Sequence, residues 1–539
     1  MIPVIDIFAG PGGLGEGFCS LTNVHGDRVF KIALSIEKDE FAHQTLTLRS
    51  FFRQFRPRKA PKEYYDFLKG KMNLDQLYNT YPKEAAHARK EAWMAKLGDT
   101  KAGFTNQIVD EKIKEALKGE KNWLLIGGPP CQAYSIVGRS RRQEKILDEK
   151  KDERVGLYKQ YLRVLAAHNP AVFVMENVKG LLSAETRENA VFTKILQDLS
   201  NPAKAFYEDF GQNGNHIKCP GYKIYSLSVR ADRFDDRRNP VYNQKDFIIK
   251  AEEYGIPQTR HRIILLGLRN DIDITPGVLR KKEPVGISQV LADLPRLRSG
   301  LSKQKDENES WRGAIRKIST KTYLRGVDAV VKEKILSQLS RIRIPTNGKG
   351  GLFVATEQSN IAYRQDWFTD KNIGGVCNHE SRGHMDSDLL RYFFVSCFGN
   401  VMHRSPKLED FPEALLPNHE NVNQGIAERK FADRFRVQLA NKPAKTITSH
   451  ISKDGHYYIH YDPLQCRSFT VREAARIQTF PDNYYFCGPR TAQFSQVGNA
   501  VPPLLANKIA EIVFPIFEKL AVIEQSENRI GKPLTPVLI

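Results

Sequence analysis

The loop around Cys131 has residue types that could present a nucleophile. It reads GGPPCQAYS over residues 127–135 and follows an apolar run that we expect to be a buried strand. Two glycines and two prolines make a stiff turn, and a thiol presented by such a turn is well placed for chemistry. The alternative is an inert core thiol, which is the commoner role of a lone cysteine in apolar surroundings.

Two further polar motifs stand beside apolar runs. Glu176 begins the sequence ENV directly after AVFVM, where a buried carboxylate is costly unless it is paired or used. A helix cap or a structural ion pair is the alternative for this residue. Arg260 and Arg262 lie in QTRHR, before the run IILLGL, and side chains two apart on a strand share one face. This pair could bind a carboxylate, a phosphate or a base.

A glycine-rich turn follows the first apolar run. GPGGLG at 10–15 matches the pattern GxGxxG, and Glu37 lies 22 residues beyond Gly15, at the end of the run KIALSIE. Glycines let the backbone approach a ligand closely, and an acid at the end of a second strand can accept hydrogen bonds from ribose hydroxyls. This arrangement fits NAD, FAD or S-adenosylmethionine, and a dehydrogenase remains an alternative from these residues.

These motifs need a scaffold that brings them together, and the apolar pattern predicts one. Short continuous runs at 2–8, 122–127, 171–175 and 263–268 are typical of strands buried on both faces. Helical spacing fills 155–168 and 188–199. We therefore predict an α/β fold with a doubly wound, mostly parallel sheet, whose ligand crevice lies at the carboxyl ends of the strands.

Several stretches depart from this alternation. Residues 51–97 hold 11 Lys/Arg against 5 Asp/Glu and are predicted to be an insertion. Residues 276–465 form the bulk of a second, smaller domain, and 276–345 alone supplies +9 of the net charge. The apolar segment 502–523 is expected to be a helix that returns to the first domain. The predicted divisions are a catalytic domain (1–275), a second domain (276–479) and a returning C-terminal segment (480–539).

The bulk composition favours an intracellular protein with a polyanionic partner. The chain has 539 residues, a formal net charge of +20 and a pI of about 9.4, and nucleic acid is the commonest partner for such an excess. A basic surface without a specific partner is the alternative. We expect no run of the about 18 apolar residues that cross a bilayer and no signal peptide. Seven scattered cysteines favour reduced thiols over a disulfide framework.

Taken together, six motifs resemble the DNA cytosine-5 methyltransferase family. They are DIFAGPGGLGEGF, GGPPCQAYS, ENV, QTRHR, REAARIQTFPD and QVGNAVPP, in the family's usual order between residues 6 and 502. The resemblance implies a Rossmann-like, S-adenosylmethionine-dependent methyltransferase domain and a target-recognition domain. It also implies Cys131 as the nucleophile on carbon 6 of a flipped cytosine, Glu176 as the group that serves ring nitrogen 3, and Arg260 and Arg262 as their anchors.

The resemblance also assigns the remaining site residues. S-adenosylmethionine, with S-adenosylhomocysteine as product, would be held by Asp6, Phe8, Ala9, Gly10, Gly12, Gly13, Leu14, Glu37, Pro130, Asn499 and Val501. DNA would be contacted by Gln132, Ser135, Arg139 and Arg141. The family's acid near the cofactor adenine is not clear, and Asp99 and Asp110 are both candidates. No metal is expected, since Cys377, His379 and His384 fit no standard zinc spacing.

The predicted biology follows the bacterial restriction-modification branch of the family. The partner would be double-stranded DNA, bound by a monomer, with a restriction endonuclease as functional counterpart and no membrane. The location would be the cytoplasm, on nucleoid DNA. A transfer-RNA cytosine-5 methyltransferase is the main alternative, although the long basic second domain favours duplex DNA. A nicotinamide-dependent oxidoreductase would leave PPCQ, ENV and QxRxR unexplained, and a catalytically dead relative would not need both Cys131 and Glu176.

Overall fold

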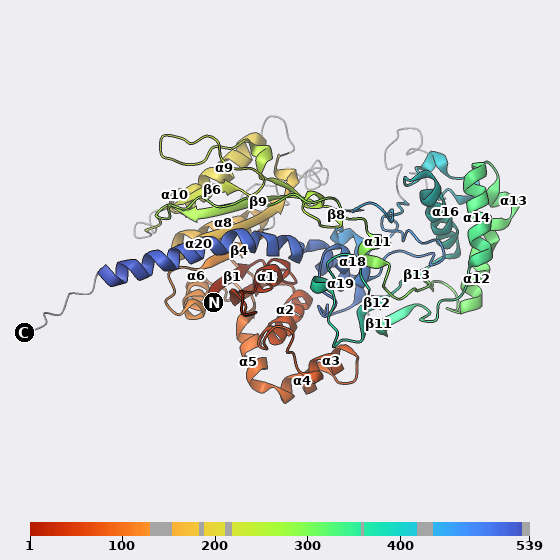
Figure 1. The fold of residues 1–539 in the computed structure, drawn as a ribbon, viewed down its shortest axis with the longest axis horizontal. Coiled ribbons are helices and arrows are strands. Elements are labelled where there is room, and N and C mark those ends of the chain that lie inside the picture. The colour runs from red at the N-terminus through yellow and green to blue at the C-terminus, as the bar shows by residue number, and fades with distance from the viewer. Residues whose placement is uncertain (130–152, 183–187, 211–217, 357–359, 418–434, 531–539) are drawn as a thin grey trace, which may run out of the picture.

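The computed structural model describes residues 1–129, 153–182, 188–210, 218–356, 360–417 and 435–530. The larger lobe contains the central sheet and its helices, and a smaller lobe gathers around α14 and α16 at the other end of the molecule (Figure 1). Between them lie α18, α19 and the β11–β12 pair. The limits predicted for the domains, 1–275, 276–479 and 480–539, stay a prediction.

A mostly parallel sheet of eight strands forms the centre of the larger lobe, as predicted. Its order is β3-β2-β1-β4-β5-β9-β6, and β7 also pairs with β9. The strands β1 to β5 run parallel, whereas β9 is antiparallel to β5, β6 and β7. The strands are β1 (Ile2–Ile7), β2 (Phe30–Glu37), β3 (Ala92–Met94), β4 (Leu124–Gly127), β5 (Val172–Val178), β6 (Tyr222–Ser226), β7 (Ile248–Lys250) and β9 (His261–Arg269).

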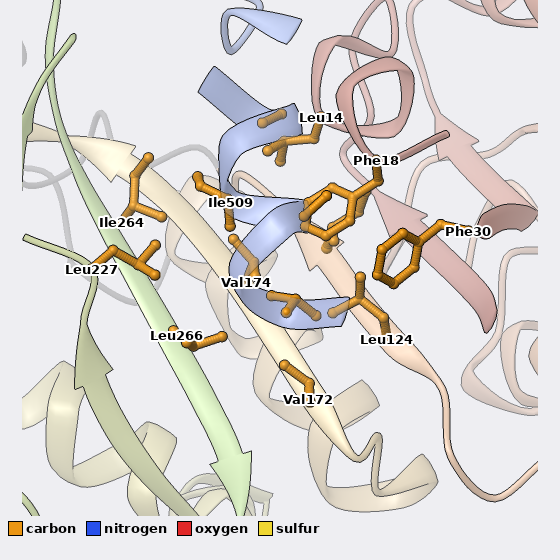
Figure 2. Close-up of a cluster of buried hydrophobic side chains, with 14 of the residues drawn as sticks. Leu14, Phe18, Phe30, Leu124, Val172, Val174, Leu227, Ile264, Leu266 and Ile509 are labelled. Atoms are coloured by element: carbon orange, nitrogen blue, oxygen red, sulfur yellow. The ribbon is translucent and has the colours of Figure 1, made fainter. Parts of the chain in front are cut away.

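Helices cover both faces of this sheet. Leu124 and Val174 pack in one apolar cluster with α1 and α20 (Figure 2), while their chain neighbours Leu125 and Phe173 pack in a second cluster with α6, α8 and α9. Burial on both faces explains why these strands appear as continuous apolar runs, and it confirms the doubly wound α/β class. The covering helices are α1 (Gly13–Cys19), α6 (Asn106–Leu117), α8 (Glu153–His168), α9 (Glu188–Ser200), α10 (Pro202–Phe210) and α20 (Pro503–Ile530).

The predicted insertion is helical and has its own apolar cluster. Phe51, Tyr64 and Leu77 pack there together with Cys377 and Cys487, which come from distant parts of the chain. The insertion therefore rests against the second domain as well as the sheet. Residues 51–97 contain α3 (Lys62–Leu68), α4 (Leu74–Thr80), α5 (Pro82–Glu91) and β3, and α2 (Glu40–Arg53) ends at their start.

The smaller lobe has a core of its own. Trp311 and Tyr392 are fully buried in it, and they lie on helices that pack against each other. Short strand pairs join this lobe to the centre, among them β11 with β12 and β8 with β14. The elements of this part are β8 (Gln258–Thr259), α11 (Ser288–Leu291), β10 (Gly300–Leu301), α12 (Asn308–Arg316), α13 (Lys321–Leu324), α14 (Ala329–Arg341), β11 (Gly350–Ala355), α15 (Gln365–Phe368), β12 (Gly375–Glu380), β13 (Gly383–His384), α16 (Asp386–Met402), β14 (Ala444–Lys445), α18 (Val471–Ile477) and α19 (Arg490–Asn499).

The returning helix α20 is more apolar than the sequence analysis allowed. Arg490–Ser526 is long and apolar enough to cross a membrane by length and composition, although we expected no such run. Within it, 72% of the most apolar window is buried, because α20 lies against α1 and the sheet (Figure 1). A buried core helix passes the same test as a membrane span, so this finding is explained by packing.

Replacing Gly17 by alanine is expected to destabilise the fold, because α1 and α20 touch through this residue. A Cβ at Gly17 would lie 2.3 Å from the Pro503 carbonyl oxygen and 2.4 Å from the Ala506 Cβ. Overpacking of this kind costs roughly 1–3 kcal/mol, and calorimetry should show a lower melting temperature. Gly313→Ala is the matched control, since Gly313 lies inside α12 with open space around it. That variant should be neutral or stabilising by up to about 1 kcal/mol, and equal losses in the two variants would contradict the prediction.

Candidate active site

The glycine loop links the end of β1 to α1 and takes a backbone shape that favours glycine. Gly10 and Gly12 have φ angles of 58° and 90°, and Phe8 is also left-handed at 58°. The Gly10 amide donates to Oε2 of Glu37 at 2.8 Å, so the acid predicted at the end of β2 lies directly against the loop. Ala9 is held by its amide, which donates to the Ile36 carbonyl at 3.2 Å.

The two sides of this loop differ in the space around them. A Cβ at Gly10 would meet nothing within 4 Å, whereas one at Gly13 would lie 2.2 Å from the Val501 carbonyl oxygen. Leu14 and Val501 are buried, and Asn499 is exposed at the end of α19. The segment 499–501 therefore closes the inner side of the loop, and the open side at Gly10 is where a nucleoside ligand could approach.

Asp6 is a buried carboxylate at the end of β1. It is 1% exposed, and neither oxygen has a hydrogen-bond partner of standard geometry among the described residues. Burial raises its pKa to about 8, Arg53 and the Gly15 amide offset part of that effect, and Glu37 adds to it. An orphaned carboxylate beneath a glycine loop is suited to a positively charged group of a ligand.

The structure separates the two candidates for the adenine acid. Asp110 lies on α6, and its carboxylate accepts from Arg163 and His168, each at 2.7 Å. The Asp110 carboxylate therefore links α6 to α8. Asp99 comes after β3, whose last residue, Met94, pairs with Glu37 of β2. The Oδ1 atom of Asp99 accepts from the Ala102 amide at 3.1 Å. Asp99 is the better placed of the two, because it lies at the carboxyl edge of the sheet.

Glu176 and Arg262 form an ion pair at the end of β5. Nε of Arg262 lies 2.8 Å from Oε1 of Glu176, and the two side chains are 16% and 13% exposed. The opposite oxygen, Oε2, would lie 3.0 Å from a Cβ at Gly128, and Asn177 donates to the Pro129 carbonyl at 3.3 Å. The carboxylate thus lies against the start of the cysteine loop, with a cation fixing its orientation.

Arg260 does not pair with Glu176 in the same way. It falls between β8 and β9, and its Nη1 donates to the Ile447 carbonyl at 2.7 Å and the Gly498 carbonyl at 3.2 Å. Burial and the neighbouring Arg262 lower its pKa. The shared strand face of the two arginines stays a prediction. Arg260 lies in the one-residue gap before β9 begins, and its Nη1 ties the sheet to the closing segments.

The nucleophile loop itself lies outside the described residues. Its predicted contributions to the site are Pro130, Cys131, Gln132, Ser135, Arg139 and Arg141.

The charged residues of REAARIQTFPD have structural partners. Arg472, Glu473 and Arg476 are all fully buried. Glu473 accepts two bonds from Arg467, and Arg476 binds both oxygens of Asp482 at 2.8 Å. This motif therefore fixes the middle of the molecule and presents no charge to a ligand.

No metal centre emerges from the histidines considered in the sequence. His379 contacts the Thr470 hydroxyl at 2.9 Å and the Pro295 carbonyl at 2.8 Å, and His384 contacts Ser468 and Tyr392. Within the described ranges, no group of three or more His, Cys, Asp or Glu side chains is arranged to hold a metal ion.

Sequence reasoning missed the support beneath the glycine loop. Arg49 binds Glu16 of α1 through two hydrogen bonds, and the Tyr484 hydroxyl donates to the Pro11 carbonyl. Tyr484 follows the motif REAARIQTFPD, which is visible in the sequence. Its contact with a loop 473 residues away is visible only in the fold.

Comparison with known proteins agrees with these motifs. The family model for C-5 cytosine-specific DNA methylase matches residues 84–203 and 232–514. The type II methyltransferase M.Bpa9945I of Bacillus paralicheniformis is 32% identical, over 95% of this chain and 98% of its own. M.DdeI of Desulfomicrobium norvegicum is 25% identical, over 76% of each chain. The DNA (cytosine-5-)-methyltransferase M.ApeKI of Aeropyrum pernix is 27% identical, over 75% of this chain and 83% of its own.

The stability of the ligand-free wild type is expected to fall as the pH rises, because Asp6 ionises, and the Asp6→Asn variant should not show this fall. The pKa of Asp6 rises from 3.8 to about 8 on folding, so its contribution is fully present below pH 3.8 and is lost as the pH rises through about 8. Between about pH 4 and pH 8, the melting temperature of the wild type should fall relative to that of Asp6→Asn. The difference should correspond to roughly 1–3 kcal/mol, the usual cost of an unsatisfied buried polar group.

Asp110→Asn serves as the control of opposite sign. Burial works against ionisation of Asp110, but His168 and Arg163 outweigh it and lower its pKa. This carboxylate stabilises the fold above its unfolded pKa, and the contribution is lost as the pH falls. Asp110→Asn should therefore lower the melting temperature at neutral pH. Identical pH profiles for the two variants would show that the environment of Asp6 has been misread.

Proposed function

This chain belongs to the family of C-5 cytosine-specific DNA methylases, and from that membership we propose how its own residues carry out the reaction. The protein is a DNA (cytosine-5-)-methyltransferase of the restriction-modification type. The proposed reaction transfers a methyl group from S-adenosylmethionine to carbon 5 of a cytosine that is flipped out of a specific double-stranded sequence. S-Adenosylhomocysteine is the product.

The glycine loop and its surroundings are proposed to bind S-adenosylmethionine. When bound, this group supplies a methyl carbon on a positively charged sulfur. The orphaned carboxylate of Asp6 suits a ligand that carries positive charge, and the open space at Gly10 suits the close approach of a ligand to the backbone. Glu37 at the end of β2 would serve the ribose, and Asp99 the adenine. The other proposed contacts are Phe8, Ala9, Gly12, Gly13, Leu14, Pro130, Asn499 and Val501.

The Glu176–Arg262 pair is the observation that carries the proposed chemistry. In the proposed route, the Cys131 thiolate forms a bond to carbon 6 of cytosine, which makes carbon 5 electron-rich enough to take the methyl group. Glu176 provides ring nitrogen 3 with a proton or a strong hydrogen bond, and Arg262 holds its carboxylate in place. Loss of the carbon 5 proton then breaks the carbon–sulfur bond and restores the thiolate. Arg260 acts as a positioning residue through the Ile447 and Gly498 carbonyls.

DNA is proposed to lie between the two lobes. A base must leave the duplex before a thiol can reach carbon 6, and Gln132, Ser135, Arg139 and Arg141 are the proposed contacts to the opened site. Segment 276–479 would read base edges while its Lys and Arg side chains contact phosphates. We propose that a monomer acts on DNA in the bacterial cytoplasm, at the nucleoid, and protects its sites from a partner restriction endonuclease.

Base-resolved methylation of a co-expressed plasmid tests the reaction. In a host without its own cytosine methylases, cytosines within one short motif should carry a methyl group on carbon 5 at nearly every copy. Cys131→Ser should abolish this methylation, because a hydroxyl is a far weaker nucleophile than a thiolate. Cys219→Ser is the matched control and should retain it, since Cys219 packs against the second apolar cluster, where its thiol donates to the Leu165 carbonyl. An unmodified plasmid, from soluble protein that binds S-adenosylmethionine, would contradict the proposal.

Glu176→Gln tests the role of the carboxylate separately from cofactor binding. It should lower kcat by roughly 10²- to 10⁴-fold, the usual contribution of a positioned acid or base, while the Kd for S-adenosylhomocysteine stays near the wild-type value. Glu253→Gln provides the control, because Glu253 pairs with Lys250 and Lys281. Full activity in Glu176→Gln would rule out the assigned role.

A further inference from the structure

The segment after α18 reaches under the glycine loop. Tyr484 is completely buried, and its hydroxyl donates to the carbonyl of Pro11. Burial raises the pKa of this hydroxyl, so it stays protonated and keeps its donor. The loop is therefore held from the inner side by one hydrogen bond, while its outer side at Gly10 stays open.

The same hydroxyl accounts for the glycine at position 12. A Cβ at Gly12 would lie 3.1 Å from the Tyr484 oxygen and 2.8 Å from Cδ2 of Leu46. Gly12 also has a φ of 90°, which a side chain rarely allows. The absence of a side chain at Gly12 thus leaves room for the Tyr484 hydroxyl. That hydroxyl provides the buried Pro11 carbonyl with a hydrogen-bond donor.

The ring of Tyr484 has little freedom to move. Its centroid lies 4.7 Å from that of Phe480 and 5.4 Å from that of Phe486. The guanidinium of Arg49 lies 4.7 Å from the same ring. A ring fixed on several sides places its hydroxyl with little loss of entropy, which makes the bond to Pro11 effective.

Arg49 extends this support to the helix that follows the loop. It donates to Oε2 of Glu16 at 2.9 Å and to Oε1 of the same carboxylate, and it donates to Oδ1 of Asn483 at 3.0 Å. Asn483 in turn donates to Asp370 at 2.8 Å. Tyr484 and Arg49 therefore hold the loop and its helix from one buried centre, and that centre is anchored in the 361–373 region.

We propose that Tyr484 is a positioning residue for cofactor binding, which preorders the glycine loop through the Pro11 carbonyl. The inference rests on the proposed binding of S-adenosylmethionine at this loop. Without the hydroxyl, the buried carbonyl loses its donor and the loop samples other conformations, so part of the binding free energy is spent on ordering it. The effect acts on affinity for the cofactor and not on the chemical step.

Tyr484→Phe removes only the hydroxyl, and Tyr485→Phe is its control. Tyr485 packs its ring on Phe67 at 5.5 Å, and its hydroxyl has no hydrogen-bond partner within the described part of the chain. Titration calorimetry with S-adenosylhomocysteine should give a Kd raised about 5- to 30-fold in Tyr484→Phe and unchanged in Tyr485→Phe. The KM for S-adenosylmethionine should rise by a similar factor, with a much smaller change in kcat.

Hydrogen exchange of the ligand-free proteins supplies a second readout. Amides of residues 9–15 should exchange faster in Tyr484→Phe than in the wild type and Tyr485→Phe, because the loop is no longer held. Equal Kd values in wild type and Tyr484→Phe, or the same loss in both variants, would overturn the inference. If the wild type itself binds no S-adenosylhomocysteine, the proposed cofactor site fails and the inference fails with it.

Discussion

The close approach of α1 to the backbone of residues 500–507 is the constraint on which the rest of the structure depends. Gly13 faces the Val501 carbonyl and Gly17 faces the Pro503 carbonyl, each at a distance that excludes a side chain. The chain leaves the sheet after β9, builds the smaller lobe and comes back against α1 here. These contacts therefore close the larger lobe and at the same time form the inner wall of the glycine loop.

Buried charge in this protein falls into two groups with different consequences. Glu473–Arg467 and Arg476–Asp482 are fully enclosed ion pairs with satisfied hydrogen bonds, and they give the middle of the molecule a single arrangement. Asp6 is enclosed without such partners, and the Glu176–Arg262 pair is partly exposed at the sheet edge. Asp6 and the Glu176–Arg262 pair can therefore still form hydrogen bonds or ion pairs with a ligand, as is expected of charged groups in a binding site.

The sequence was sufficient for the fold class and for Glu37 at the end of β2, whereas the roles of the site residues stay predictions. Continuous apolar runs identified β1, β4, β5 and β9, because these strands are buried on both faces. The short strands β3, β6 and β7 were missed, since three to five residues carry too little pattern to separate them from loops. Spacing did not indicate that Arg260 would bind the Ile447 and Gly498 carbonyls, because these acceptors lie far along the chain. Tyr484 and Arg49 could not be found, because their contacts join positions hundreds of residues apart.

The cluster around the insertion has a consequence for engineering. Cys377 of β12 and Cys487 share their apolar surroundings with Phe51, Tyr64 and Leu77, and Tyr65 donates to Asp370 at 2.8 Å. A chimaera in which residues 276–479 come from a relative would leave that surface facing a different neighbour. An exchange of residues 353–377 for those of a relative is therefore expected to need matching changes within 48–91.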